Sequence, residues 1–151
     1  MARIELSYGM LGSRLKAIGD IKLRYDRLGS RLKSIGDMEL DYDRLGNRLK
    51  AIGDIKLQYD HLGSRLKSIG DMELDYDMLG NRPKAIGGIE LRYDHLGSRL
   101  KSIGDVELDY GNLGSLPKAL VVPINSQLTG MRLSMIFLVL HEEQRIRNSR
   151  G

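Results

Sequence analysis

Histidines next to carboxylates are the residues in this sequence that could transfer protons or bind a metal. His61 and His95 lie 34 residues apart, and each follows an aspartate, Asp60 or Asp94. As chemistry, this arrangement would be a metal-binding or proton-transfer pair. Met78 occupies the equivalent position in another copy of the same pattern, so that position does not require histidine. We therefore interpret both histidines as exposed turn residues.

The other candidates for metal binding are weaker. His141 precedes Glu142, but a zincin helix needs a second histidine on the same face. Aspartates also recur directly after glycine, at Asp20, Asp37, Asp54, Asp71 and Asp105. A calcium-binding nonapeptide repeat needs a denser Gly-Asp spacing, and turn chemistry already explains these residues. The sequence predicts no metal site and no cofactor.

Catalytic signatures are also missing from the residue pattern. The chain has no cysteine, which excludes disulfides and thiolate metal sites. Its glycines do not form a phosphate-binding loop, and no Ser-His-Asp set can be singled out because each type recurs at many equivalent places. Catalysis needs one constellation, whereas this sequence offers the same residues repeatedly. We expect a protein that is not an enzyme.

The repetition itself is the dominant feature of the chain. All seven tyrosines lie 17 residues apart, at Tyr8, Tyr25, Tyr42, Tyr59, Tyr76, Tyr93 and Tyr110. A short fixed period is the signature of a repeat architecture. The array ends where the composition changes, which predicts two regions: a seven-unit array over residues 1–118, and a connector with a C-terminal helix over residues 119–151.

Each unit predicts a β-hairpin. Residues 21–25 alternate apolar and polar side chains, the pattern of a half-buried strand. Residues 26–29 read Asp-Arg-Leu-Gly, which suits a three-residue loop with a bulge. Residues 31–35 form a return strand, and Gly36-Asp37 is typical of a two-residue turn into the next unit.

The two turns together predict one register. Ile35 would face Met38, and Arg31 would face both Tyr25 and Tyr42. One face of the sheet then carries columns of Ile/Met, Leu and Tyr, with Arg and Lys stems lying between them. An arginine on a tyrosine ring adds a cation–π interaction of about 0.5–1 kcal/mol if exposed.

A four-residue first loop is the alternative register, and it inverts the return strand. Tyr25 would then face Leu32, whereas the favoured register puts Leu32 and Ser34 on the outer face. Pro83 and Pro117 replace this leucine in two units. Because proline donates no hydrogen bond, it predicts a free amide beside a bulge or a loosely paired segment there.

Charges alternate between successive units. Lys22 and Arg24 are followed by Glu39 and Asp41, although Glu90 breaks the rule in the sixth unit. Opposite charges across a sheet help by roughly 0.2–1 kcal/mol, so the alternation reflects either contact between units or duplication of a 34-residue block. The signs are interleaved and the net charge is only +4, which argues against a nucleic-acid partner.

The C-terminal region predicts a helix. Residues 116–125 form a connector or a last irregular strand, and Ser126 or Thr129 could cap a helix that runs to about Arg147. A buried strand over residues 135–140 is the alternative. The sequence shows no signal peptide and no transmembrane segment, so we expect no membrane partner. A cytoplasmic location is the default, with the cell surface or secretion by a non-Sec route as alternatives.

The predicted fold is mainly β: an antiparallel hairpin array in one continuous curved sheet, with a C-terminal helix packed on it. A β-solenoid with 17 residues per coil is the alternative. Fourteen strands would make a sheet roughly 65 Å wide. A helix about 27 Å long cannot cover its apolar face. The remainder would be hidden by coiling, by self-association or by a partner.

The segment Tyr42-Asp43-Arg44-Leu45-Gly46-Asn47-Arg48-Leu49 and its copies resemble the YD repeat of Rhs-type proteins. The resemblance covers residues 4 to about 118. It implies antiparallel hairpins in one sheet, which in large members spirals into a shell around a C-terminal toxin or decorates a cell surface. Seven short units are too few for such a closed shell, so a scaffold or interaction surface is what carries over.

The sequence therefore predicts a non-enzymatic structural or protein-interaction repeat protein. A protein partner or self-association would use the Tyr/Leu/Ile face, with the seven tyrosines as the binding row. Carbohydrate or cell-surface binding by the same tyrosine row is the alternative function.

Overall fold

The computed structural model describes residues 1–9, 14–26, 31–43, 48–60, 65–77, 82–94, 99–111, 116–128 and 130–150, with side chains only as far as residue 141. Each unit supplies two strands. The first strands are β1 Ala2–Tyr8, β3 Ile21–Tyr25, β5 Met38–Tyr42, β7 Ile55–Tyr59, β9 Met72–Tyr76, β11 Ile89–Tyr93 and β13 Val106–Asp109. The return strands are β2 Leu15–Ile18, β4 Leu32–Ile35, β6 Leu49–Ile52, β8 Leu66–Ile69, β10 Pro83–Ile86, β12 Leu100–Ile103 and β14 Ala119–Val122. One helix, α1, spans Gly130–Arg150.

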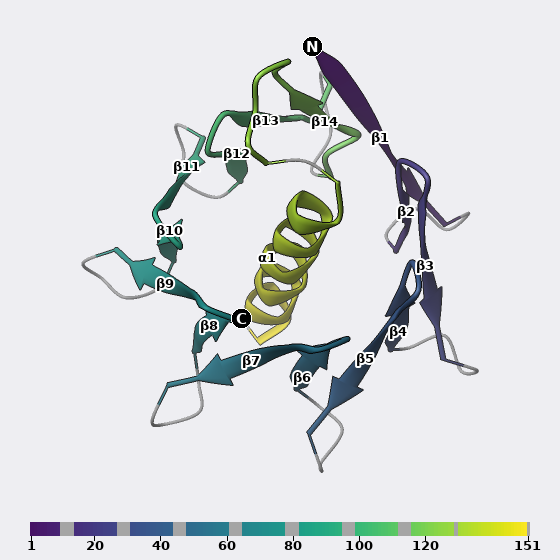
Figure 1. The fold of residues 1–151 in the computed structure, drawn as a ribbon, viewed down its shortest axis with the longest axis vertical. Helices are drawn as coiled ribbons and strands as arrows, with labels where there is room; N and C mark the ends of the chain where they lie inside the picture. The colour runs from purple at the N-terminus through teal and green to yellow at the C-terminus, as the bar shows by residue number, and fades with distance from the viewer. Residues whose placement is uncertain are drawn as a thin grey trace.

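The antiparallel hairpins are confirmed, but the sheet is not open. Each strand pairs with its neighbours in sequence, and β1 also pairs with β14, so the fourteen strands form a closed barrel (Figure 1). The open curved sheet and the solenoid are therefore both wrong.

A constant stagger between units explains the closure. Leu23 pairs with Ile35, and Ile35 pairs with Met38, so Leu23 lies level with Met38. The residue equivalent to Met38 in its own unit is Ile21, two positions earlier. Each unit is thus displaced by two residues in the same direction, and strand tilt with accumulated stagger is what closes a barrel.

The second turn of each unit is confirmed. In the turn between β4 and β5, Ile35 pairs with Met38, as predicted. Gly36 has φ +60°, and no non-glycine residue in the described ranges has a positive φ. A positive φ at the first central residue alone is the pattern of a type II′ turn, which suits a hairpin.

The favoured register at the first turn is wrong. Tyr25 pairs with Leu32 rather than Arg31, and the register shifts between Arg24 and Tyr25. The alternative register is therefore correct at the tyrosine, with an irregularity inside the strand pair. The predicted loop bulge at residues 27–30 lies outside the described residues.

This irregularity turns two apolar side chains of the return strand inward. Leu32 is 5% exposed and Ile35 is 0% exposed, whereas Lys33 between them is exposed. A strictly alternating strand would put Leu32 and Ile35 on opposite faces, but one extra residue restores both to the same face. The placement of Leu32 on the outer face is therefore wrong.

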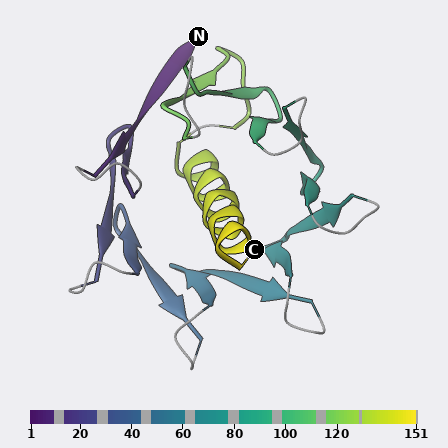
Figure 2. The same cartoon turned by 180° about the vertical axis from the view of Figure 1, so that it is seen from behind.

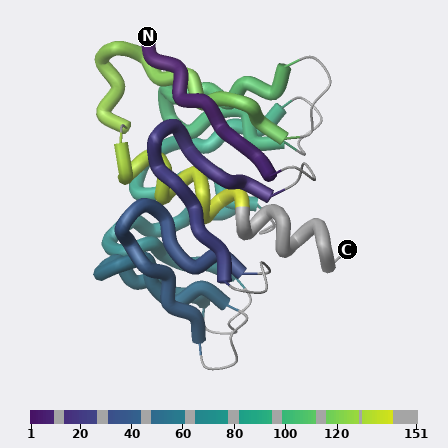
Figure 3. Tube along the Cα trace, turned by 90° about the vertical axis from the view of Figure 1, so that its right-hand side faces the viewer, coloured from purple at the N-terminus to yellow at the C-terminus, as the bar shows by residue number. Residues whose placement is uncertain are grey.

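The helix lies inside the barrel (Figures 1 and 2), and the view from the side shows it threaded through the ring of strands (Figure 3). All eight residues from 133 to 140 are buried. A helix that is apolar all round belongs in a core, and here the barrel supplies that core on every side. The predicted helix is confirmed and the strand alternative at 135–140 is wrong, but the helix is enclosed rather than packed on an outer face.

The connector to the helix contributes to the barrel as well. Of the two interpretations of residues 116–125, the structure shows the strand, β14. Ser126 lies four residues before the helix begins, so it is not the cap; Thr129 is outside the described residues. The Ser126 hydroxyl instead donates to Asp105 Oδ1 at 2.7 Å and accepts the Leu128 N–H at 3.0 Å.

Closure removes the argument for an uncovered apolar face. The core cluster combines inward leucines and isoleucines of the strands with helix residues 133–140. The barrel wall and the helix therefore cover each other, and no open sheet face needs a partner for burial. Among the described residues, the large hydrophobic side chains left exposed are Met1 and Ile124.

Candidate functional site

The seven tyrosines form a regular row that joins each unit to the one before it. The hydroxyl of Tyr59 donates to the carbonyl oxygen of Leu49 at 2.7 Å, ten residues earlier in the chain. Tyr42, Tyr76, Tyr93 and Tyr110 make the same bond at 2.5–2.7 Å, and Tyr25 makes it with Leu15. All of these tyrosines are partly buried. Each hydroxyl is thus engaged within the barrel wall.

An arginine of the preceding unit covers one face of six of these rings. The Arg48 Cζ lies 4.3 Å from the centroid of the Tyr59 ring, and the other five pairs lie at 4.1–4.3 Å. The predicted contact of Arg31 with Tyr42 is present, while the Tyr25 ring is covered by Arg14 instead. A guanidinium at this distance from a partly exposed ring contributes about 0.5–1 kcal/mol.

Four of these arginines also pair with the aspartate that follows the tyrosine of their own unit. Arg99 Nε lies 3.0 Å from Asp94 Oδ2, and the equivalent distance is 3.5 Å for Arg65 and Asp60. The Arg82–Asp77 and Arg31–Asp26 pairs are looser, at 3.6 and 3.9 Å. The Tyr-Asp and Arg residues of the repeat therefore form one interaction group, which we call the bracket. It links the two strands of a hairpin to each other and to the next hairpin.

The two prolines fit this bracket. Tyr93 donates to the carbonyl of Pro83 at 2.7 Å, and Tyr8 donates to the carbonyl of Pro117 at 2.5 Å. Proline lacks an N–H but keeps its carbonyl, and that carbonyl is the group that the tyrosine uses. Pro83 is also the first residue of β10 and lies beside the register shift, a position where proline is tolerated.

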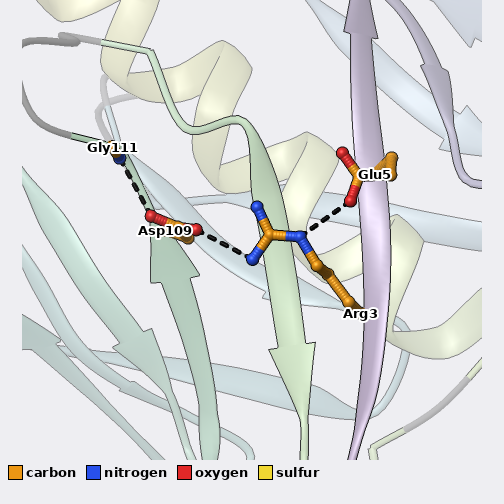
Figure 4. Close-up of polar contacts among 4 residues, drawn as sticks. All are labelled: Arg3, Glu5, Asp109 and Gly111. Carbon is orange, nitrogen blue, oxygen red and sulfur yellow. Dashed lines mark hydrogen bonds and ion pairs between the residues drawn. The ribbon is translucent and has the colours of Figure 1, made fainter.

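The ring closes at a seam between β1 and the last unit. Ala2 to Glu5 of β1 pair with Val122 to Ala119 of β14. Arg3 reaches over this pairing: its Nη1 lies 2.9 Å from Asp109 Oδ2 on β13, and its Nε lies 2.7 Å from Glu5 Oε2 (Figure 4). Asp109 Oδ1 also accepts the Gly111 N–H at 2.9 Å. This backbone bond, followed by Arg3, holds the pKa of Asp109 below its ordinary value.

The seam places two units of like charge side by side because seven is an odd number. Units that alternate in charge around an odd ring must meet a like-charged unit once. Here Asp109 of the last unit and Glu5 of the first unit are both acidic, and Arg3 bridges them. The last unit also lacks the arginine of the repeat. Leu116 precedes Pro117, whereas in the other units an arginine precedes the equivalent leucine or proline.

Two tyrosines near the seam resist ionisation. Burial raises the pKa of Tyr110 to about 12, although nearby Arg99 opposes this. Burial also raises the pKa of Tyr8, and the neighbouring Tyr110 adds to the effect. Desolvation disfavours a phenolate, so both side chains stay neutral hydrogen-bond donors well above the ordinary tyrosine range.

Replacing Tyr59 by phenylalanine is expected to destabilise the protein by about 1 kcal/mol. The change removes the bond to the Leu49 carbonyl while the ring and its contact with Arg48 remain. Urea unfolding followed by circular dichroism measures the difference. Gln58→Ala, at the exposed neighbouring position, is the control and is expected to stay within about 0.5 kcal/mol. An equal loss in both variants would contradict the role given to the hydroxyl.

Alkaline pH is expected to destabilise the barrel through Tyr8 and Tyr110. Because folding raises the pKa of these side chains, their contribution is complete below the ordinary value of 10.0 and is lost as pH rises toward about 12. The free energy of unfolding should therefore fall more steeply with pH in this window for wild type than for Tyr8→Phe/Tyr110→Phe. Urea unfolding at several pH values measures both slopes, and identical slopes would contradict the assignment.

Among the described residues, the other candidates do not assemble into a chemical site. His61 and His95 lie outside the described residues. His141 stacks on Phe137, with ring centroids 5.5 Å apart, near the end of the buried part of the helix. The aspartates after the turn glycines are exposed. Within the described ranges, no three His, Cys, Asp or Glu side chains are grouped so that they could hold a metal.

Sequence reasoning found the tyrosine row but missed its partners. The hydroxyls bind backbone carbonyls, which every residue type carries, so the sequence gives no direct signal for them. The pairing of Arg3 with Asp109 also joins residues that are far apart in the chain and follows only from closure.

In the part of the chain that the structure describes, no helix is both long enough and apolar enough to span a membrane. Comparison with protein-family models, with curated proteins and with solved structures found no match to this chain.

Proposed function

We propose that this protein is a non-enzymatic structural repeat protein that offers its outer wall to protein contacts. The observation that carries the proposal is the repeated bracket. The tyrosine, arginine and aspartate of the repeat, which carry its polar and charged groups, recur in one arrangement around the barrel. Six of the described tyrosine rings have both the hydroxyl bond and the covering arginine. This supports a role in stabilising the barrel wall rather than in a single active site.

Self-association through the Tyr/Leu/Ile face, as the sequence suggested, loses its main support. Its leucines and isoleucines face the helix, and the tyrosine hydroxyls are engaged. Contacts with other proteins would instead use the charged outer surface of the strands. The likeness to YD repeats supports a scaffold role, which stays a proposal. Carbohydrate binding by the tyrosine row stays the alternative, although an arginine already covers one face of six rings.

Affinity capture from the native host tests the proposal. We expect wild type to retain defined proteins, Tyr59→Phe to retain the same set, and variants with reversed charge at exposed strand positions to lose them. Retention on a glycan array that is abolished by changes to the tyrosine row would favour the carbohydrate alternative. A catalytic activity that one substitution removes without loss of fold would overturn the proposal.

A further inference from the structure

The outer wall of the barrel carries charges that are not used inside the molecule. Lys22 and Arg24 on β3 and Glu39 and Asp41 on β5 are all exposed. Within the described residues, none of these four takes part in an ion pair. The opposite charges of β3 and β5 therefore form no ion pair across the return strand β4. The charges are available for a surface outside the wall.

The alternation continues over four units. Lys56 on β7 is again basic beside Gln58, and Glu73 and Asp75 on β9 are again acidic. All four side chains are exposed. The pattern ends on β11, where Glu90 and Arg92 pair with each other at 3.1 Å. Strands β3 to β9 thus form the alternating wall, and its stripes differ in sign from one unit to the next.

Repetition puts equivalent residues at equal heights. The pairing register is the same from unit to unit, and the tilt of the strands compensates the stagger between units. Measured along the barrel axis, a residue and its counterpart 17 positions later are therefore related by a rotation about that axis. Lys22 therefore lies at the height of Glu39, and Arg24 lies at the height of Asp41. A two-fold axis parallel to the barrel, placed midway between β3 and β5, sets each basic stripe against the acidic stripe of the other copy.

We propose that the alternating wall is the contact surface between two copies of this chain, which associate side by side. Such an interface is self-complementary, as a two-fold dimer requires. Around the axis, Lys22 and Arg24 of each copy meet Glu39 and Asp41 of the other. Lys33 of both copies lies near the axis, and this single like-charged contact is outnumbered by four opposite ones. Between β5 and β7 and between β7 and β9 the same placement pairs Lys56 with Glu39 or Glu73, but Gln58 adds no charge there, so two opposite contacts form instead of four.

The association should be weak and sensitive to salt. Exposed ion pairs are screened by ions, and two convex walls touch over a narrow strip. Charge complementarity mainly selects the partner and its orientation. This inference rests on the proposed function and names one partner for the same outer wall.

Sedimentation over a range of protein concentrations, at low and high salt, tests the proposal. We expect the mass of wild type to rise toward that of a dimer at low salt and to return to the monomer at high salt. Monomeric wild type at low salt and the highest concentrations would overturn the proposal, and so would association that salt does not weaken. Binding of poly-glutamate by such a monomer would show that an acidic partner occupies the wall instead.

Two charge variants make the test specific. Lys22→Glu/Arg24→Glu/Lys56→Glu leaves the wall acidic, and Glu39→Lys/Asp41→Lys/Glu73→Lys/Asp75→Lys leaves it basic. Each variant alone should stay monomeric at low salt, while an equal mixture should associate. A variant that dimerises as wild type does would overturn the proposal. Circular dichroism checks folding, and the wild-type salt series decides the question even if a variant misfolds. Capture of host proteins by a strictly monomeric wild type would leave the proposed function standing while this inference fails.

Discussion

Aspartate in place of Leu133 is expected to leave the protein unfolded at neutral pH. Leu133 is 0% exposed and belongs to α1, the helix that lies inside the barrel (Figure 2). Removing a buried leucine side chain costs about 2–5 kcal/mol, and an unpaired buried carboxylate costs several kcal/mol more. The sum is comparable with the whole stability of a domain, about 5–15 kcal/mol. Far-UV circular dichroism and urea unfolding measure the outcome.

The matched control is the same substitution one residue earlier. Arg132 is exposed, and a negative charge near the beginning of a helix is favourable, so Arg132→Asp should change stability by less than about 1 kcal/mol. Phe137→Ala gives an intermediate test. Its ring is 1% exposed, and its removal should destabilise by about 3–5 kcal/mol. If Leu133→Asp unfolds with the same midpoint as Arg132→Asp, the helix does not lie in the lumen.

The elements themselves could be predicted because each follows from a local rule. Apolar alternation at residues 21–25 predicts a strand, and Gly36-Asp37 predicts the turn that the structure shows. The segment before His141 predicts a helix, and α1 confirms it, although its enclosure by the barrel was not predicted. In each case the signal lies within one unit or one segment, so neighbouring residues are sufficient to determine it.

Closure could not be predicted because it is a property of the whole array. Each hairpin contributes a stagger of two residues, as the alignment of Leu23 with Met38 shows, and only the sum over seven units brings β1 beside β14. The size of the lumen must also match the girth of α1. No single residue records either quantity.

The prediction of the strand register failed at a point where the residue types give no signal. The irregular pairing falls beside Lys33 and Ser34, neither of which marks a bulge as glycine would. Ser34 pairs with the exposed residues Arg24 and Glu39, so it faces outward and is buried at 8% exposure beneath longer side chains. A strand rule with strict alternation cannot place Leu32 and Ile35 on the same side.

The tyrosine row could be predicted from the sequence, whereas its use as a binding row stays a prediction. The tyrosine row follows from the 17-residue period, and its inward lean follows from the alternation. Its hydrogen-bond partners are carbonyls of the preceding unit, and Pro83 shows that the side chain at that position is immaterial. Backbone acceptors leave no trace in a sequence, which is why a binding row was the natural hypothesis.

Removal of residues 1–9 is expected to destroy the cooperative fold by opening the seam. The deletion takes away β1, the Tyr8 bond to Pro117 and the Arg3 contact with Asp109. It leaves β2 and β14 as unpaired edges and uncovers apolar lumen, both of which promote aggregation. We expect a loss of more than about 4 kcal/mol, measured by urea unfolding, together with large species in light scattering. A peptide of residues 1–9 added in trans should restore the monomer, whereas a scrambled peptide should not. A truncated protein that unfolds as wild type does would show that the ring does not depend on its seam.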